Sequence, residues 1–193
     1  MSKKVIIISS TPRKNGNSQI LCEAFKKGTE EAGNEAELIS LRENKINYCI
    51  ACYGCSKTGR CVQKDGMNEI LDKIIEADVL VLATPIYMYD VCGQLKTFID
   101  RIFPKYSEIK DKDLYFIATC AEEEKEVISG AVETINGLLE CLDNVELKGI
   151  IYGTGLDKAG EALNSKAYVL GIPEDGNLRQ YGVDNCKIEE YVL

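Results

Sequence analysis

Histidine is absent from this sequence of 193 residues. Its absence excludes Ser-His-Asp and Cys-His nucleophilic machinery, in which histidine serves as the base, and it excludes zinc sites that depend on imidazole ligands. An enzyme without this acid–base residue is most easily understood when a bound cofactor carries the chemistry. We therefore expect no catalytic side chain, and look for a cofactor instead.

Long apolar runs and surplus positive charge are missing as well. Only four strongly apolar residues (5–8) follow Lys3-Lys4, which is too few for a secretory signal, and no stretch approaches the roughly 20 residues of a membrane helix. The formal net charge of −8 argues against nucleic acid and anionic membrane surfaces as partners, because both select for basic patches. The composition predicts a soluble, cytoplasmic protein that binds neither.

Two common nucleotide-binding motifs are also absent. The sequence contains no Gly-x4-Gly-Lys-Ser/Thr pattern, which disfavours nucleotide hydrolysis. The dinucleotide fingerprint G-x-G-x-x-G is missing too, because Gly153-Thr154-Gly155 has no glycine at the sixth position. A ligand with a single terminal phosphate is therefore easier to accommodate than one with a pyrophosphate.

What the sequence does contain is a regular alternation of apolar and amphipathic segments. The β-branched run at residues 5–8 is typical of a strand buried on both faces of a parallel sheet. The expected strands are residues 5–8, 36–41, 79–83, 114–118 and 145–152, and the expected helices are residues 20–33, 70–75, 95–103, 127–142 and 159–170.

Five strand–helix repeats predict an α/β fold, namely a flavodoxin-like three-layer sandwich with a five-stranded parallel sheet of order 2-1-3-4-5. We expect residues 1–193 to form one domain, with a cysteine-rich loop at about 46–65 and a C-terminal extension at about 171–193 that shows no clear period. Ligands of such sheets bind at the carboxyl ends of the strands. This rule indicates the loops at residues 9–18, 84–89 and 119–124.

The first of these loops has the composition of a phosphate site. It joins a buried strand to a helix, and a helix N-terminus offers unpaired N–H groups and a partial positive charge. Hydroxyl groups of Ser9, Ser10, Thr11 and Ser18 can add donors, and Arg13 can supply a charge-assisted hydrogen bond. The same composition also fits an ordinary strand–helix loop with a polar cap.

Residues 10–18, Ser-Thr-Pro-Arg-Lys-Asn-Gly-Asn-Ser, resemble the Ser-x-Pro-Arg-x-x-Gly-Asn-Ser/Thr phosphate loop of the flavin mononucleotide (FMN) reductases. Residues 77–78, 83–87 (Ala-Thr-Pro-Ile-Tyr) and 93–101 (Gly-Gln-Leu-Lys-Thr-Phe-Ile-Asp-Arg) are similar to the same family. The match covers roughly the first 150 residues. It departs from many relatives at Cys120-Ala121, where they carry Gly-Gly.

The resemblance implies a bound FMN whose ring carries the chemistry, with NAD(P)H as a possible electron donor. It implies that the phosphate is held by Ser10, Arg13, Asn15, Asn17 and Ser18, and that the ring lies against Pro85, Ile86, Tyr87, Met88 and Tyr89 and against Thr119 and Cys120. The family's habit of placing flavin at a subunit interface implies a homodimer or homotetramer.

Nine cysteines are many for a cytoplasmic chain, where disulfides are rare. Five are dispersed, and we expect each to be a small buried apolar residue: Cys22, Cys92, Cys120, Cys141 and Cys186. The other four form the compact run Cys49-x2-Cys52-x2-Cys55-x5-Cys61. This spacing favours the corners of a [4Fe–4S] cluster, because structural zinc sites separate their Cys pairs by a dozen or more residues.

The cysteine spacing also resembles the compact motif of the iron–sulfur flavoproteins, a branch of the same superfamily. It predicts an FMN-dependent oxidoreductase that moves electrons between a donor, such as ferredoxin or NAD(P)H, and an acceptor. Two alternatives remain open. One is a cluster-free NAD(P)H-dependent FMN, quinone or azo reductase, and the other is a non-enzymatic flavin electron carrier with a structural zinc site.

Overall fold

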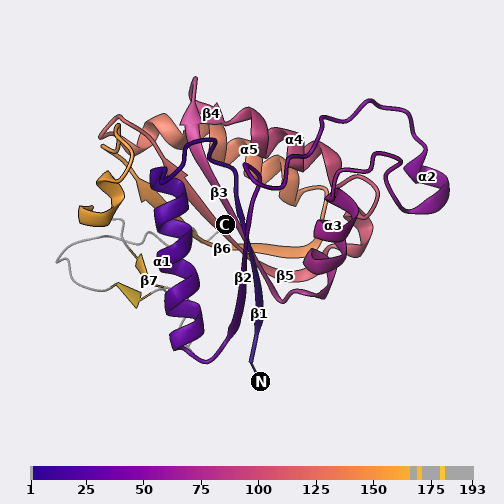
Figure 1. Ribbon diagram of the computed structural model, residues 1–193, viewed down its shortest axis with the longest axis horizontal. Coiled ribbons are helices and arrows are strands. Elements are labelled where there is room, and N and C mark those ends of the chain that lie inside the picture. The colour runs from indigo at the N-terminus through magenta and orange to yellow at the C-terminus, as the bar shows by residue number, and fades with distance from the viewer. Residues whose placement is uncertain (1, 166–168, 171–178, 181–193) are drawn as a thin grey trace.

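A six-stranded sheet forms the centre of the molecule, which is described here as a computed structural model covering residues 2–165, 169–170 and 179–180 (Figure 1). Five strands are parallel, in the order β2-β1-β3-β5-β6. They are β1 (Lys4–Ser9), β2 (Glu35–Ser40), β3 (Val79–Tyr87), β5 (Lys110–Thr119) and β6 (Asp143–Gly153). Counted along the chain, this is the predicted order 2-1-3-4-5, which is confirmed.

The sixth strand was not expected from the sequence. β4 (Asp90–Val91) pairs antiparallel with the end of β3 and forms a hairpin on it. Strand β3 is correspondingly longer than predicted, because it continues past Pro85 to Tyr87 instead of ending at residue 83. This extension carries part of the functional edge of the sheet.

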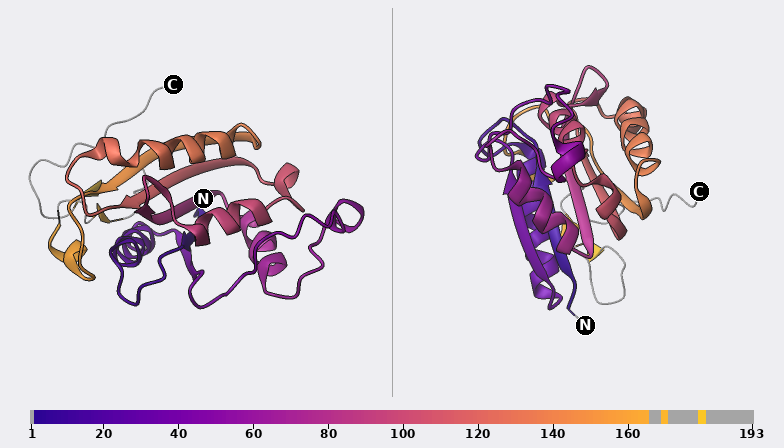
Figure 2. Two further views of the ribbon diagram at one scale, coloured as in Figure 1. Left: turned by 90° about the horizontal axis from the view of Figure 1, so that it is seen from above. Right: turned by 90° about the vertical axis from the view of Figure 1, so that its right-hand side faces the viewer.

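Helices cover both faces of the sheet (Figure 2). The longer ones are α1 (Asn17–Glu31), α3 (Met67–Glu76), α4 (Gly93–Arg101) and α5 (Ser129–Leu139), and short helical turns lie at α2 (Cys55–Thr58), η1 (Tyr106–Glu108), η2 (Lys125–Ile128) and η3 (Glu161–Asn164). Among the described residues, no helix combines the length and the hydropathy of a membrane span.

Alternation along β1 explains how two cores form around one sheet. Ile6 and Ile8 point to the face where α3, α4 and α5 bury their apolar side chains. Val5 and Ile7 point to the opposite face, where they pack against α1 and η3. Successive side chains of a strand alternate between faces, so a run of four β-branched residues supplies both cores at once.

The last predicted helix, at residues 159–170, is wrong in its described part. Only the short turn η3 (Glu161–Asn164) is helical there, and β7 (Val169–Leu170) is a strand that pairs with β8 (Arg179–Gln180). The apolar spacing that indicated a helix reflects burial of one side of an irregular segment, since Ala162 packs into the core beside α1. Apart from β8, the predicted extension at 171–193 lies outside the described residues.

Candidate functional site

The carboxyl ends of the parallel strands surround an open pocket of about 180 Å³. All three loops predicted to meet there contribute, and a fourth segment after β6 joins them. The lining residues are Thr11, Arg13, Gly16, Asn17 and Ser18 from the first loop, Pro85, Ile86 and Tyr87 from β3, Thr119, Cys120 and Ala121 after β5, and Leu156 and Asp157 after β6.

The N-terminus of α1 opens into this pocket. Its first N–H groups have no acceptor within the helix, and no side chain caps them. The first turn also carries no acidic residue. A helix end of this kind attracts an anion through its N–H groups and through the positive end of the helix dipole.

Gly16 makes the tight approach to this helix possible. A Cβ atom at this position would lie 2.5 Å from Thr11 Oγ1 and 3.3 Å from the carbonyl oxygen of Arg13. The chain therefore folds back on itself just before α1, and the loop closes around a space that any larger residue would fill. The backbone torsions of Gly16 (φ −65°, ψ 151°) are ordinary, so the requirement for glycine is one of space.

Two buried hydroxyl groups connect the first and third loops. Ser18 Oγ and Thr119 Oγ1 lie 2.7 Å apart, and the two residues are 1% and 4% exposed. Since a hydroxyl both donates and accepts, this pair retains hydrogen-bonding capacity for a ligand in the pocket that both residues line.

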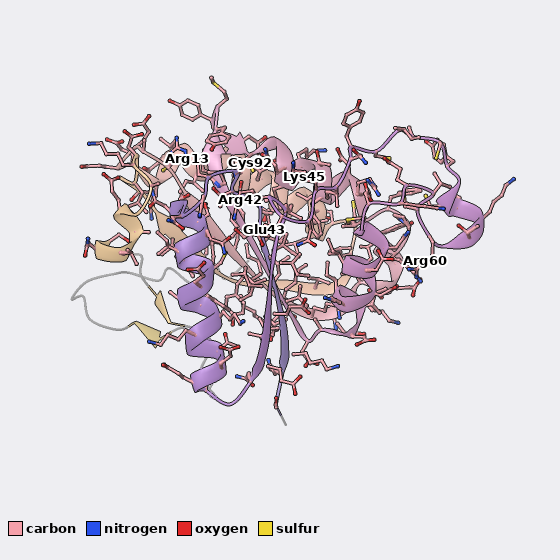
Figure 3. All side chains as sticks on the ribbon, viewed as in Figure 1. Arg13, Arg42, Glu43, Lys45, Arg60 and Cys92 are labelled. Atoms are coloured by element: carbon pink, nitrogen blue, oxygen red, sulfur yellow. The ribbon has the colours of Figure 1, made fainter. Side chains whose placement is uncertain are left out.

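Asn17 and Arg13 hold the fourth segment in place. The Asn17 amide donates to the carbonyl oxygens of Leu156 (3.2 Å) and Lys158 (2.9 Å), and its oxygen accepts from the N–H of Ala162 (3.1 Å). Arg13 donates through Nη1 to the carbonyl oxygen of Asp157 (2.8 Å). The Asn17 side chain, expected at the phosphate, is thus occupied by backbone groups. Arg13 is exposed, lies near the start of α1 (Figure 3) and is one of the residues that line the pocket.

Two other predicted phosphate ligands lie outside the pocket lining. Ser10 is fully buried, and its hydroxyl donates to the carbonyl oxygen of Ala83 (2.7 Å) and lies 3.1 Å from Cys92 Sγ. Asn15 is exposed in the loop and has a left-handed backbone (φ 56°). Their roles in ligand binding stay predictions, and Ser10 in particular fastens the loop to β3.

The β3–β4 hairpin rises beside the pocket with two residues at its tip. Met88 (φ 50°) and Tyr89 (φ 66°) both have left-handed backbones, as a tight two-residue hairpin turn demands, although neither is a glycine or asparagine. Their exposed fractions are 97% and 67%. Neither lines the pocket, in contrast to Tyr87, so the structure separates the predicted ring-contacting residues into two groups.

Helix α5 supports this hairpin. Thr134 Oγ1 donates to Asp90 Oδ1 (2.8 Å), and the carbonyl oxygen of Tyr89 lies where a Cβ on Gly130 would come within 2.4 Å. The absence of a side chain at Gly130 therefore lets the hairpin settle directly on the helix. The left-handed backbone of Met88 and Tyr89 is strained. Such strain persists only where the surrounding structure holds it, and it is often found at ligand sites.

Cys120 closes the floor of the pocket as a neutral thiol. It is 5% exposed, and burial raises its pKa above the ordinary thiol value. Its N–H donates to the carbonyl oxygen of Gly153 (2.9 Å), and its own carbonyl accepts from Leu156 (2.8 Å). These bonds join the third loop to the segment after β6. Cys120 thus contributes to the shape of the pocket and does not present a reactive thiolate.

The cysteine loop extends away from this pocket: it begins beside Pro12, and α2 lies at the right-hand end of Figure 1, whereas α1 lies on the left side of the sheet (Figures 1 and 2). Cys49 and Cys52 are exposed, Cys55 and Cys61 are partly exposed, and all four thiols are free. Within the described part of the chain, no three cysteine or carboxylate groups converge on one metal position. Four thiols are suitable ligands for an iron–sulfur cluster, but the loop holds them apart from one another.

Three of the four dispersed cysteines that the structure describes follow the expectation. Cys22, Cys92 and Cys120 are buried, as predicted. Cys141 is exposed, so its prediction as a core residue is wrong. The helical pattern at residues 127–142 overran the true end of α5 at Leu139, which places Cys141 in the turn beyond it. Cys186 lies outside the described residues.

Leu156 and Asp157 are the lining residues that lie outside the three predicted loops. They follow Gly153-Thr154-Gly155 at the end of the fifth parallel strand, so the rule that pointed to the other three loops also applies to this segment. The sequence interpretation considered Gly153-Thr154-Gly155 only as a possible dinucleotide-binding motif, so it did not assign the following segment to the site.

Comparison with known proteins identifies relatives of the chain. The sequence profile of a family described as NADPH-dependent FMN reductase matches residues 3–133. The chain is 42% identical over 101 residues to an iron-sulfur flavoprotein of Archaeoglobus fulgidus (52% of this chain, 46% of that protein). It is equally identical over 101 residues to an iron-sulfur flavoprotein of Methanocaldococcus jannaschii (52% of each). The match spans about half the length of these two relatives.

Solved structures share the fold at low sequence identity. An NAD(P)H:quinone oxidoreductase from Methanothermobacter marburgensis superposes with a TM-score of 0.69 at 19% identity, covering 87% of this chain and 92% of the other. An azoreductase from Bacillus anthracis gives a TM-score of 0.63 at 19% identity, covering 85% and 94%. These likenesses confirm the flavodoxin-like architecture and, with the family profile, the resemblance that the first loop indicated. The chain belongs to the NADPH-dependent FMN reductase family, whose members are flavin-dependent oxidoreductases.

Proposed function

We propose that this chain is a cytoplasmic, FMN-dependent oxidoreductase that transfers electrons between a donor and an acceptor at the carboxyl edge of its sheet. The observation that carries the proposal is the uncapped N-terminus of α1, which opens into a pocket bounded by all the predicted loops. The family profile covers this loop and the strands around it.

The residues of the pocket fit a flavin monophosphate. The N–H groups at the start of α1 and the hydroxyl of Ser18 would hold the phosphate, and Arg13 at the rim would add a positive charge by exchanging its present backbone acceptor for a phosphate oxygen. Pro85, Ile86 and Tyr87 offer a mostly apolar wall for the ring. Bound FMN supplies one- and two-electron chemistry, which requires no histidine from the protein.

Comparing the affinities of the protein for FMN and for flavin adenine dinucleotide tests the proposed cofactor. The pocket ends at a single helix N-terminus, so we expect FMN to bind more tightly in a fluorescence titration of the apoprotein. Anaerobic mixing of the FMN-loaded protein with NADH, NADPH or reduced ferredoxin then tests electron transfer. Failure to bind FMN, or failure of all three donors to bleach the flavin absorbance, would contradict the proposal.

We further propose that Cys49, Cys52, Cys55 and Cys61 ligate a [4Fe–4S] cluster. Their spacing, their free thiols and the likeness to the iron-sulfur flavoproteins support this assignment. The loop must close to bring the four sulfurs together. Iron and acid-labile sulfide in the anaerobically reconstituted protein test the proposal, and replacing any of the four by serine should reduce both without changing FMN affinity. Stoichiometric zinc at these thiols would refute it.

The second candidate function is a cluster-free NAD(P)H-dependent reductase of FMN, quinones or azo compounds. It is favoured by the open arrangement of the four cysteines in the described part of the chain. A protein that contains FMN, lacks iron after reconstitution, and is reduced rapidly by NAD(P)H would establish this alternative.

We also propose that the protein acts as a homodimer or homotetramer, with ferredoxin or NAD(P)H as its electron donor. The apolar side chains exposed beside the pocket, Tyr87, Met88 and Tyr89, support an assembly that covers them. Light scattering coupled to size-exclusion chromatography, with and without FMN, measures the state directly. A monomer under both conditions would contradict this assignment.

A further inference from the structure

Arg101, the last residue of α4, is a fully buried charge outside the flavin pocket. Its side chain is 1% exposed, and it forms a two-pronged ion pair with Asp65, whose side chain is 5% exposed. Nη1 lies 2.8 Å from Asp65 Oδ2, and Nη2 lies 2.9 Å from Oδ1. Burial of two charges is costly unless their geometry is good and their remaining hydrogen bonds are made, so this pair calls for a reason beyond packing.

The pair joins the two ends of the cysteine loop. Asp65 ends the loop, and it accepts hydrogen bonds from the backbone N–H of Asn47 (2.8 Å) and from the Asn47 side chain (3.3 Å) at the beginning of the loop. Arg101 Nη1 also donates to the carbonyl oxygen of Asn47. Arg101, Asp65 and Asn47 therefore close the neck of a loop, residues 48–64, that carries all four clustered cysteines.

Cys61 lies beside this neck, and its backbone is tied to α3. Its N–H donates to Asn68 Oδ1 (2.8 Å), and its carbonyl oxygen accepts from Asn68 Nδ2 (3.0 Å), so its backbone is fixed to α3. The pKa of the Arg101 guanidinium is raised chiefly by its hydrogen bond to Asp65, and Cys61 nearby contributes in the same direction. The thiol is therefore a neighbour of the buried cation.

The guanidinium of Arg101 also carries a buried nitrogen that the neck does not use. Its Nε is buried and has no hydrogen-bond partner among the described residues. An orphaned N–H of a charged group is expensive to bury, and such groups usually find a partner in the working form of a protein.

We infer that Arg101 is the positioning residue of the cysteine loop: it closes the neck through Asp65 and Asn47 beside Cys61, and keeps its Nε–H for a sulfur atom of the bound cluster. The last part rests on the cluster binding proposed above. The neck concerns the protein alone and does not depend on the metal.

Arg101→Lys separates this role from a simple requirement for positive charge. Lysine keeps the charge and can reach Asp65, but one ammonium cannot reproduce the planar fork that serves Asp65 and Asn47 together. Arg60→Lys is the matched control, because Arg60 lies in the same loop and pairs with Asp72 at the surface, where the two side chains are 47% and 46% exposed.

Hydrogen exchange on the protein without metal measures the neck. We expect backbone amides of residues 48–64 to exchange at least tenfold faster in Arg101→Lys than in the wild type, and less than twofold faster in Arg60→Lys. FMN affinity should stay within twofold in both variants, which verifies that the fold is intact. If Arg101→Lys does not fold, Asp65→Asn tests the same neck, because it keeps the guanidinium and weakens only its acceptor. If the amides of residues 48–64 exchange at the wild-type rate in Arg101→Lys, or in Asp65→Asn where that variant replaces it, the inference is overturned.

Anaerobic reconstitution with iron and sulfide measures how Arg101 affects cluster uptake. We expect Arg101→Lys to take up less than half the iron and sulfide of the wild type, whereas Arg60→Lys takes up the full amount. In the fraction that is loaded, the reduction potential of the cluster should fall, because a hydrogen bond to sulfur raises it. An unchanged potential would overturn the role of Nε. If the wild type itself takes up no iron, the cluster proposal fails, and the exchange rates alone decide whether Arg101 closes the loop.

Discussion

Gly16→Ala is the sharpest test of the first loop, because a single added carbon atom meets a known obstacle. The new Cβ would lie 2.5 Å from Thr11 Oγ1, about 0.9 Å inside the shortest ordinary contact of 3.4 Å. Alanine adopts the backbone torsions of Gly16 without strain, so the cost is steric alone. Overpacking of this kind costs about 1–3 kcal/mol.

Loops in general deform more easily than helices, so we expect the strain to appear mainly as a loss of ligand affinity. We expect the dissociation constant for FMN to rise by about 5- to 150-fold, which corresponds to about 1–3 kcal/mol. Fluorescence quenching of FMN measures this constant, and thermal unfolding in the absence of FMN measures the remaining cost to stability.

The double variant Gly16→Ala/Thr11→Ala tests the cause. Thr11→Ala removes the obstructing oxygen, so the loss on adding Gly16→Ala should be smaller in the Thr11→Ala background than in the wild type, a coupling that a double-mutant cycle measures. Gly137→Ala in α5 is the control, because nothing lies within 4 Å of its new Cβ, and it should leave FMN affinity unchanged. Equal losses in both backgrounds, or no loss at all, would refute the steric argument.

Three further predictions concern other parts of the molecule. Ser18→Ala removes a buried hydroxyl that is paired with Thr119, and it should weaken FMN binding by about 1 kcal/mol in the same titration; an unchanged constant would place the phosphate elsewhere. Replacing Met88-Tyr89 by Asn-Gly should raise the free energy of unfolding by about 1–2 kcal/mol in urea titrations, because both positions have positive φ; destabilisation would show that the side chains are needed in the isolated chain. Arg101 holds the pKa of Asp65 at about 2, below its ordinary value of 3.8. The stabilisation from this depressed pKa is present above pH 3.8 and is lost as the pH falls toward 2, by about 2 kcal/mol, and Asp65→Asn should abolish this part of the acid dependence.

The sequence by itself determined the architecture and the edge at which the site lies. The β-branched run at residues 5–8 feeds both faces of the sheet, and such runs can only be buried between two layers of helices. Where strands alternate with helices, the right-handed crossover between parallel strands and the short connections allow few arrangements of the sheet. The order of the parallel strands could therefore be predicted. The loops at residues 9–18, 84–89 and 119–124 then had to meet, because the carboxyl ends of parallel strands share one edge.

Only the tertiary structure decided what individual polar side chains do. Asn17 was assigned to a phosphate from its place in a loop motif, yet its amide is saturated by backbone groups about 140 residues away. Arg101 reads as an ordinary helix end, although it is buried against Asp65 and closes the cysteine loop. Spacing along the chain records which residues share a strand or a helix face. Hydrogen-bond partners depend on how distant segments meet, and local periodicity carries no information about such contacts.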